Sequence, residues 1–149
     1  SRHPNWVSAV KATGSEVIAV SGGVGRGLYF HSSAGVTEDY SDAFGEGSFP
    51  YLASVNDTPA ISDFANNPLR YWGLSSKPSS LAILFNFSWV NNVMVESHNE
   101  SGSVSSVRIT GIRSGRPVEE IVDGAEFRRR LGLRSTNYEV EVRSPFSDV

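Results

Sequence analysis

Hydrophobic positions in the first part of the chain recur at two spacings, which predict one helix and one hairpin. Apolar residues follow Pro4 at helical spacing, so we expect a helix over about residues 4–12. Strand-like runs at 16–20 and 27–31 flank the sequence SGG at 21–23, which is typical of a hairpin connection.

The middle of the chain has little periodicity. Residues 32–59 are rich in Gly, Ser, Asp and aromatic side chains, which predicts a long ordered loop. NNP at 66–68 predicts a turn, and apolar spacing after Pro78 predicts a short helix through residue 85. Residues 86–94 fit either the helical or the strand period.

Alternation returns in the last third of the chain. We expect strands over 103–112 and 117–122, joined by a turn at Ser114-Gly115. Alternating apolar side chains at 138–142 predict a closing strand.

A helix is predicted between these strands. Asp123 and Glu126 have the spacing of a capping box, and Phe127 and Leu131 share one face. Gly132 supplies the left-handed residue that ends such a helix.

Composition turns these elements into a fold class. The chain has 149 residues, of which 39% are hydrophobic and 11% aromatic, enough for a folded core in one domain. We therefore predict a single α+β domain over residues 1–149, with antiparallel β-hairpins, three or four short helices and long ordered loops.

Charge and residue counts exclude several classes of site. A net charge of −3 argues against a nucleic-acid binder, and the absence of cysteine excludes disulfides and thiolate metal sites. His3, His31 and His98 are isolated, so we expect neither a metal nor a cofactor. The longest apolar run, residues 81–85, is too short to span a membrane.

Four segments in a fixed order resemble a known family. They are WVSAVKATG at 6–14, YFHSSAGVTE at 29–38, FPYLASV at 49–55 and GAEFRRRLGLRST at 124–136. Their order and spacing are similar to those of the stage II sporulation protein D / amidase enhancer LytB (SpoIID/LytB) family, over most of the chain.

The resemblance implies work on the bacterial cell wall, outside the cytoplasm. Sporulation members are similar to lytic transglycosylases that cut peptidoglycan glycan strands, and LytB-type members modify a cell-wall amidase. The family's catalytic Glu lies in a segment of the type E-M-P, which has no counterpart here. We therefore expect the C-terminal portion of the family domain, from a longer protein, which binds glycan strands. The alternative is a non-catalytic module that docks an amidase.

The hydroxyl-rich loop after the first predicted hairpin is the main candidate site. Short hydroxyl side chains leave room for a ligand and can bond sugar hydroxyls. The alternative is an ordered turn in which Ser and Thr bond the backbone. Because the resemblance implies that this loop lines the family's groove, we expect it to bind substrate through Ser32, Ser33, Thr37, Glu38 and Tyr40.

Glu38 is the one catalytic candidate. Cleaving a glycosidic bond needs a carboxylic acid with a raised pKa beside the leaving oxygen. Nothing in the spacing forces Glu38 into a desolvated cleft, and we favour the alternative of a surface carboxylate.

Four arginines lie within seven residues near the C-terminus. They could meet wall carboxylates or phosphates. The alternative places Arg129 and Arg130 on the solvent face, and ties Arg128 or Arg134 into an internal ion pair. Arg134 and Ser135 belong to the characteristic LRST sequence, so we expect these two residues to line the groove.

Overall fold

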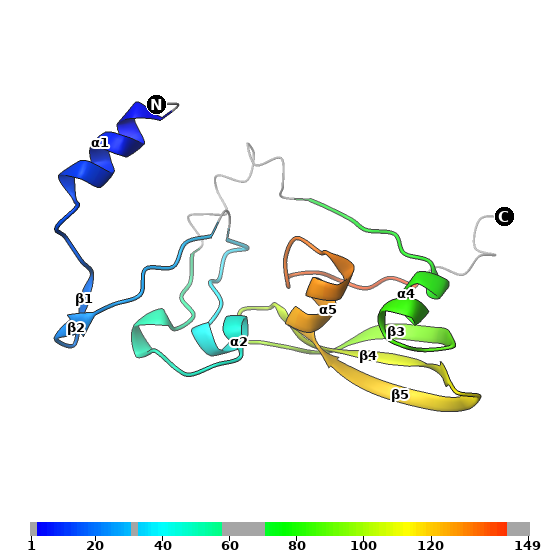
Figure 1. Ribbon diagram of the computed structural model, residues 1–149. Helices are drawn as coiled ribbons and strands as arrows, with labels where there is room; N and C mark the ends of the chain where they lie inside the picture. The colour runs from blue at the N-terminus through cyan, green and yellow to red at the C-terminus, as the bar shows by residue number, and fades with distance from the viewer. Residues whose placement is uncertain (1–2, 31–32, 58–70, 143–149) are drawn as a thin grey trace. The chain divides into compact units, whose positions relative to one another are not determined.

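The computed structural model describes residues 3–30, 33–57 and 71–142 of the chain. Contacts divide the chain into two units, Ser1–His31 and Ser32–Val149, and each is described by itself (Figure 1).

Unit 1 contains the predicted helix and a very short hairpin. Helix α1 (Pro4–Ala12) begins at a proline and confirms the helix expected over residues 4–12. Strand β1 (Ala19–Val20) pairs with β2 (Gly23–Val24), and not with the described residues 27–30 of the second predicted strand. Ser21 and Gly22 have φ angles of 48° and 81°, so the chain reverses within two residues and pairing resumes at once. The second predicted strand was therefore wrong.

Unit 2 opens with a loop that contains more structure than predicted. Residues 40–44 form helix α2 (Tyr40–Phe44), followed by the 3-10 helix η1 (Pro50–Leu52). The Asp39 side chain accepts a hydrogen bond from the Ser41 amide at 2.8 Å, and Gly45 ends α2 with φ 72°. The predicted turn at 66–68 lies outside the described residues.

Three antiparallel strands form the sheet of unit 2. Strand β4 (Val104–Arg113) lies between β3 (Trp89–His98) and β5 (Arg116–Asp123). The hairpin over 103–122 is confirmed, and its turn has φ 52° at Ser114 and 76° at Gly115. In the stretch of uncertain period, 86–94, the residues from Trp89 onward join β3, because β3 pairs along most of β4, whereas residues 86–88 lie outside the strand.

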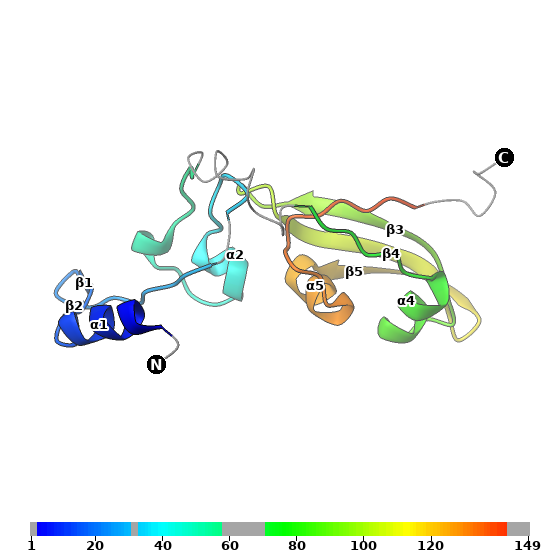
Figure 2. The ribbon, with the colours of Figure 1, turned by 90° about the horizontal axis from the view of Figure 1, so that it is seen from above.

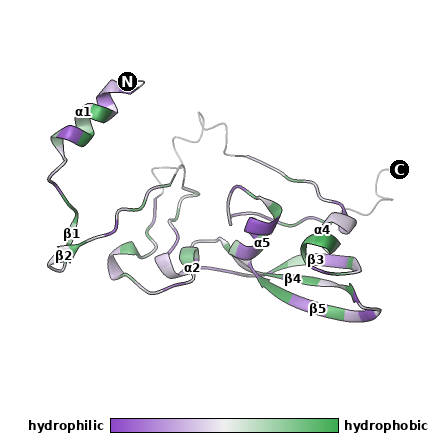
Figure 3. Ribbon diagram, in the orientation of Figure 1, coloured by the Kyte–Doolittle hydropathy of each residue, from purple (hydrophilic) through white to green (hydrophobic). Residues whose placement is uncertain are grey.

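Helices α4 (Pro78–Leu84) and α5 (Gly124–Leu131) cover one face of this sheet (Figures 1 and 2). The helix predicted after Pro78 is thus confirmed. Helix α4 is mostly hydrophobic, whereas α5 is mostly hydrophilic and contributes one ring, Phe127, to the core (Figure 3). The buried core comprises Ala82, Phe85, Phe87, Val90, Val93, Val104, Val107, Ile109, Val122 and Phe127.

Caps fix both ends of α5 as predicted. The Asp123 carboxylate accepts a hydrogen bond from the Glu126 amide at 3.0 Å. At the other end, Gly132 has φ 65° and the Leu133 amide donates to the Arg128 carbonyl at 3.0 Å.

The segment after α5 packs on the core without forming the predicted strand. Tyr138 and Val140 lie against the core, and the Tyr138 ring centroid is 5.8 Å from that of Phe127. Residues 138–142 have no ladder of backbone hydrogen bonds with the sheet, so that prediction was wrong. Aromatic stacking holds the segment where a strand was expected.

Tyr138 predicts a loss of stability at high pH. Burial raises the pKa of the phenol to about 12, and the negative charge of Asp123 adds to the rise. The unfolded phenol titrates near pH 10, so the neutral side chain stabilises the fold fully below about pH 10. This contribution is lost as the pH rises through about 12. Urea unfolding between about pH 9 and about pH 11 should show the decline. The Tyr138→Phe variant should lose less free energy of unfolding over this pH range. An equal loss in the wild type and the variant would contradict the prediction.

The antiparallel sheets and short helices confirm the α+β class. Among the described residues, no helix has both the length and the apolar character needed to cross a bilayer. That the whole chain is one SpoIID/LytB-like domain stays a prediction.

Candidate functional site

The hydroxyl-rich loop uses its side chains to hold its own backbone. Ser33 is buried, and its hydroxyl accepts a hydrogen bond from the Gly35 amide at 3.0 Å. The Thr37 hydroxyl accepts from the Val55 amide at 2.9 Å, and the Thr37 amide donates to the Val55 carbonyl at 2.9 Å. Ser32 lies outside the described residues. This arrangement matches the alternative of an ordered turn.

The Glu38 side chain points away from the loop and contacts a cluster of polar side chains from distant segments of the chain. One carboxylate oxygen accepts from the Ser103 hydroxyl at 2.5 Å and from the Asn99 amide at 3.2 Å. The other oxygen accepts from the Thr136 hydroxyl at 3.2 Å. Ser103 also accepts from Asn99 and Ser101, each at 3.0 Å, so every member of the cluster bonds another.

The cluster joins two of the four segments that carry the family resemblance. Glu38 ends the segment 29–38, and Thr136 ends the segment 124–136. The Thr136 carbonyl also accepts from the Val104 amide at 2.8 Å, which fixes the second segment to the start of β4. Both oxygens of Glu38 are occupied by internal donors, an arrangement that suits a positioning role better than proton transfer to a ligand.

Other carboxylates lie close to this cluster. Burial raises the pKa of Asp42, and the negative charges of Asp39, Glu38 and Glu100 add to the rise. The pKa of Asp39 is lowered instead, because the Ser41 hydroxyl and amide both donate to it. The neighbourhood of Glu38 is therefore acidic.

Removing the carboxylate should destabilise unit 2. Glu38→Ala leaves the nearly buried Ser103 hydroxyl and the Thr136 hydroxyl without their acceptor, so we expect a loss of about 1–3 kcal/mol in the free energy of unfolding. Urea unfolding measures it. The control Glu100→Ala removes an exposed carboxylate nearby and should stay within about 0.5 kcal/mol of the wild type. Equal losses in both variants would contradict a role for the cluster.

Tyr40 takes part in an aromatic cluster. It is buried, and its ring centroid lies 4.8 Å from Phe44 and 4.8 Å from Phe49. Phe49 in turn contacts Tyr51 at 5.8 Å. These ring contacts connect α2 and η1 around Tyr40, whereas Phe44 and Tyr51 stay exposed.

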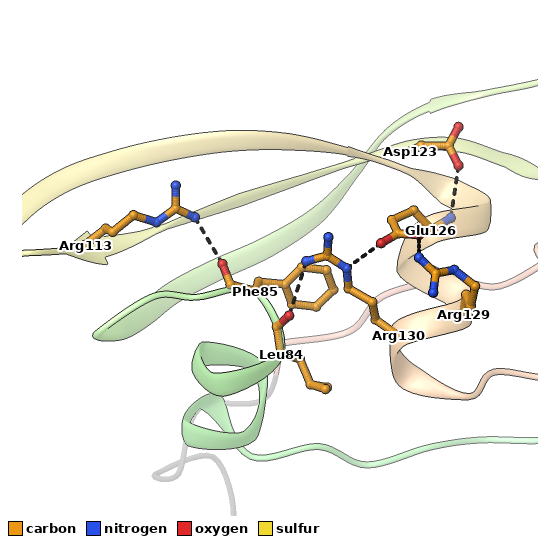
Figure 4. A network of polar contacts seen from close by, with 7 residues as sticks. All are labelled: Leu84, Phe85, Arg113, Asp123, Glu126, Arg129 and Arg130. Carbon is orange, nitrogen blue, oxygen red and sulfur yellow. Dashed lines mark hydrogen bonds and ion pairs between the residues drawn. The ribbon is translucent and has the colours of Figure 1, made fainter.

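Two arginines hold the C-terminal end of α4, where helix carbonyls lack intrahelical partners. Arg130 of α5 donates to the Leu84 carbonyl at 3.2 Å, and Arg113 of β4 donates to the Phe85 carbonyl at 3.0 Å (Figure 4). Their guanidinium groups also lie over the rings of Phe85 and Phe87, 5.1 and 4.4 Å from the centroids. Arg130 is exposed, as the interpretation of a solvent-facing residue expected, and its guanidinium also holds the end of α4.

The remaining arginines are Arg129, which faces solvent as expected, and Arg128 and Arg134. Arg129, with 73% of its side chain exposed, pairs with Glu126, which also binds Arg130 (Figure 4). The hydrogen bond from Arg130 has the larger effect on Glu126 and that from Arg129 adds to it, and together they lower the pKa of the Glu126 carboxyl. In the described part of the chain, neither Arg128 nor Arg134 forms an ion pair, so the alternative of an internal pair is not observed there.

A shallow depression of about 360 Å³ lies beside the end of α5. It lies between residues 71–74 and residues 132–134, and the predicted site residue Arg134 lines it. Ser135 does not line it, and its hydroxyl accepts from the Asn137 amide at 3.0 Å. A second depression adjoins the first at Gly132 and Leu133 and is lined by α5, including Arg128.

Sequence reasoning missed several residues that the structure brings into these places. Trp72 and Tyr71 line the depression, and Asn99 and Ser103 complete the Glu38 cluster. A polar run in the β3–β4 connection was the only signal for the last two. No group of three or more His, Asp or Glu side chains able to hold a metal occurs within residues 3–30, 33–57 and 71–142.

Comparison of the chain with protein-family models, with curated proteins and with solved structures finds no match.

Proposed function

We propose that this chain is a peptidoglycan-remodelling module of the SpoIID/LytB type, which acts outside the cytoplasm and binds glycan strands. The observation that carries the proposal is the hydrogen bond between Glu38 and Thr136. It joins the ends of two segments that resemble the family, although 98 positions separate them. Segments that recur together in a family are expected to share one structural site.

The proposal puts the glycan at the depression beside α5. The hydroxyls of Ser33 and Thr37 already accept hydrogen bonds from backbone amides, so they are poorly placed to bind a ligand. Two residues beyond Arg134 in the chain, Thr136 reaches Glu38, so the Glu38 cluster fixes the segment that lines the depression. Trp72 offers an aromatic ring on which the C–H face of a pyranose can pack.

Retention on peptidoglycan tests this proposal. The purified chain is mixed with isolated sacculi and with glycan strands, and anhydro-sugar products are sought by chromatography. We expect retention on both materials, and a loss of retention in Trp72→Ala. The matched control is Trp89→Ala, which removes an equally large ring that is 55% exposed on the sheet. Neither retention nor cleavage by the wild-type chain would refute the proposal.

A second candidate is a module that docks a cell-wall amidase without binding glycan itself. The sheet face opposite α4 and α5 exposes Trp89, Met94 and Ile121. Arg108 on this face pairs with Glu96 at 2.5 Å and with Glu119 at 2.6 Å. If Trp89→Ala abolishes capture of a wall amidase while Trp72→Ala does not, the docking function is favoured.

A further inference from the structure

The surface around the end of α5 carries two arginines that no acidic side chain balances among the described residues. We call it the α5 C-cap surface and define it by the linings of the two adjoining depressions. One depression is lined by residues 71–74 and 132–134. The other is lined by Arg128 and Arg129, by the carboxylates Asp123 and Glu126, and by Ala125, Gly132 and Leu133. The two share Gly132 and Leu133, so they form one continuous shallow area.

Two arginines of this surface have no acidic partner among the described residues. Arg108, Arg113, Arg129 and Arg130 each pair with a glutamate. Arg128 instead donates from one terminal nitrogen to the Arg134 carbonyl at 3.3 Å, and the Arg134 side chain forms none of the observed hydrogen bonds. A guanidinium carries five N–H donors in a planar fork, so most of their donor capacity remains for a ligand.

The hydrogen bond from Arg128 places its guanidinium against the backbone of Arg134, where the two depressions adjoin. The carbonyl end of α5 stabilises nearby positive charge by a few tenths of a kcal/mol to about 1 kcal/mol per residue. The helix end offers single carbonyl acceptors, whereas a carboxylate or phosphate group can accept two parallel hydrogen bonds from one guanidinium. An oxyanion bound here would gain two guanidinium partners in a chain whose net charge is −3.

Two aromatic side chains, those of Trp72 and Tyr71, lie in the same depression as Arg134. Gly73 follows them, and a Cβ added to this glycine would have no heavy atom within 4 Å. The backbone there is therefore open to a ligand. An aromatic ring next to a guanidinium fork suits a ligand with a C–H face and an acidic substituent.

We infer that the α5 C-cap surface binds an acidic saccharide, with the sugar ring against Trp72 and its oxyanion on Arg134 and Arg128. The inference rests on the proposed function for the sugar and adds the charged group that selects it. The oxyanion is a carboxylate or a phosphate, which share the geometry that an arginine fork recognises.

Titration with small sugars tests the inference on the whole chain. The probes are N-acetylmuramic acid for the carboxylate, N-acetylglucosamine 6-phosphate for the phosphate and N-acetylglucosamine as the neutral counterpart. NMR spectra of the ¹⁵N-labelled chain report the indole N–H of Trp72. We expect at least one acidic sugar to shift this signal at concentrations about tenfold below those that the neutral sugar needs. The acid that binds identifies the source of the oxyanion.

Variants at the arginines complete the test. Arg134→Ala should weaken binding of the acidic sugar about tenfold, whereas Arg134→Lys should fall between, because lysine keeps the charge and loses the fork. The control Arg116→Ala removes an exposed arginine from the β4–β5 turn and should leave affinity unchanged. Arg134 is exposed and its side chain makes none of the observed hydrogen bonds, so thermal unfolding of its variants should match that of the wild type.

Three outcomes would overturn the inference. They are equal affinity for neutral and acidic sugars, equal affinity of the Arg134→Ala and Arg116→Ala variants, and no binding of any acidic sugar. If the wild-type chain is still retained on sacculi in any of these cases, the proposed function stands and only the oxyanion site is rejected.

Discussion

Replacing Phe85 by alanine is expected to lower the free energy of unfolding of unit 2 by about 3–5 kcal/mol. Phe85 follows α4, is 1% exposed, and its ring centroid lies 5.3 Å from that of Phe127. The truncation loses the transfer free energy of the ring and leaves a cavity between α4, α5 and the sheet. It also removes the ring beneath the Arg130 guanidinium.

Urea unfolding followed by far-ultraviolet circular dichroism measures this loss. The matched control is Ile83→Ala, two residues earlier in α4, where the side chain is 83% exposed. We expect this control to stay within about 0.5 kcal/mol of the wild type. Similar losses in the two variants would mean that α4 does not pack on the sheet through Phe85.

Gly124→Ala is expected to cost about 3 kcal/mol, although it adds only one methyl group. A Cβ at Gly124 would lie 1.9 Å from the carbonyl oxygen of Val104 and 2.7 Å from its carbonyl carbon. The new atom meets backbone at the start of β4, so α5 must move away from the strand. That movement would disturb the Glu38 cluster, because the Val104 amide donates to the Thr136 carbonyl.

Gly73→Ala is the control for this substitution. Gly73 has no heavy atom within 4 Å of a Cβ position, so we expect a change within about 0.5 kcal/mol. Denaturant unfolding of both variants at the same pH tests the pair. A Gly124→Ala protein as stable as the Gly73→Ala protein would show that α5 does not approach β4 as closely as described.

Elements with strong local signals could be predicted from the sequence. Pro4 and Pro78 mark the first turns of α1 and α4, because proline suits a position whose amide has no intrahelical partner. Asp123 and Gly132 mark the ends of α5, because each residue type satisfies the backbone at one helix end. The β4–β5 hairpin follows from alternation on both sides of a Ser-Gly turn.

Elements with weak or competing local signals could not be predicted in the same way. Helix α2 has five residues, and its Asp39 and Gly45 caps lay within a stretch without periodicity. The residues from Trp89 to Met94 became a strand only because β4 supplied a partner. At the C-terminus, the alternation of Tyr138 and Val140 did reflect burial, but stacking on Phe127 replaced strand pairing.

The candidate site shows the same division. Sequence reasoning selected Glu38 and Arg134, and the structure places them in different surroundings: Glu38 in a hydrogen-bonded cluster and Arg134 at a shallow depression. Glu38 bonds Asn99, Ser103 and Thr136, which are 61, 65 and 98 positions away in the chain. Local spacing carries no information about such partners, because only the folded chain brings them within hydrogen-bond distance.

By itself, the sequence determined the first turns of α1 and α4, both ends of α5 and the β4–β5 turn, because proline, glycine and capping side chains act on their nearest neighbours. The tertiary structure alone decided which arginines are paired with acids and which, at the end of α5, are not. Charge pairing depends on distances between separate elements, and those distances exist only after α4, α5 and the sheet have packed.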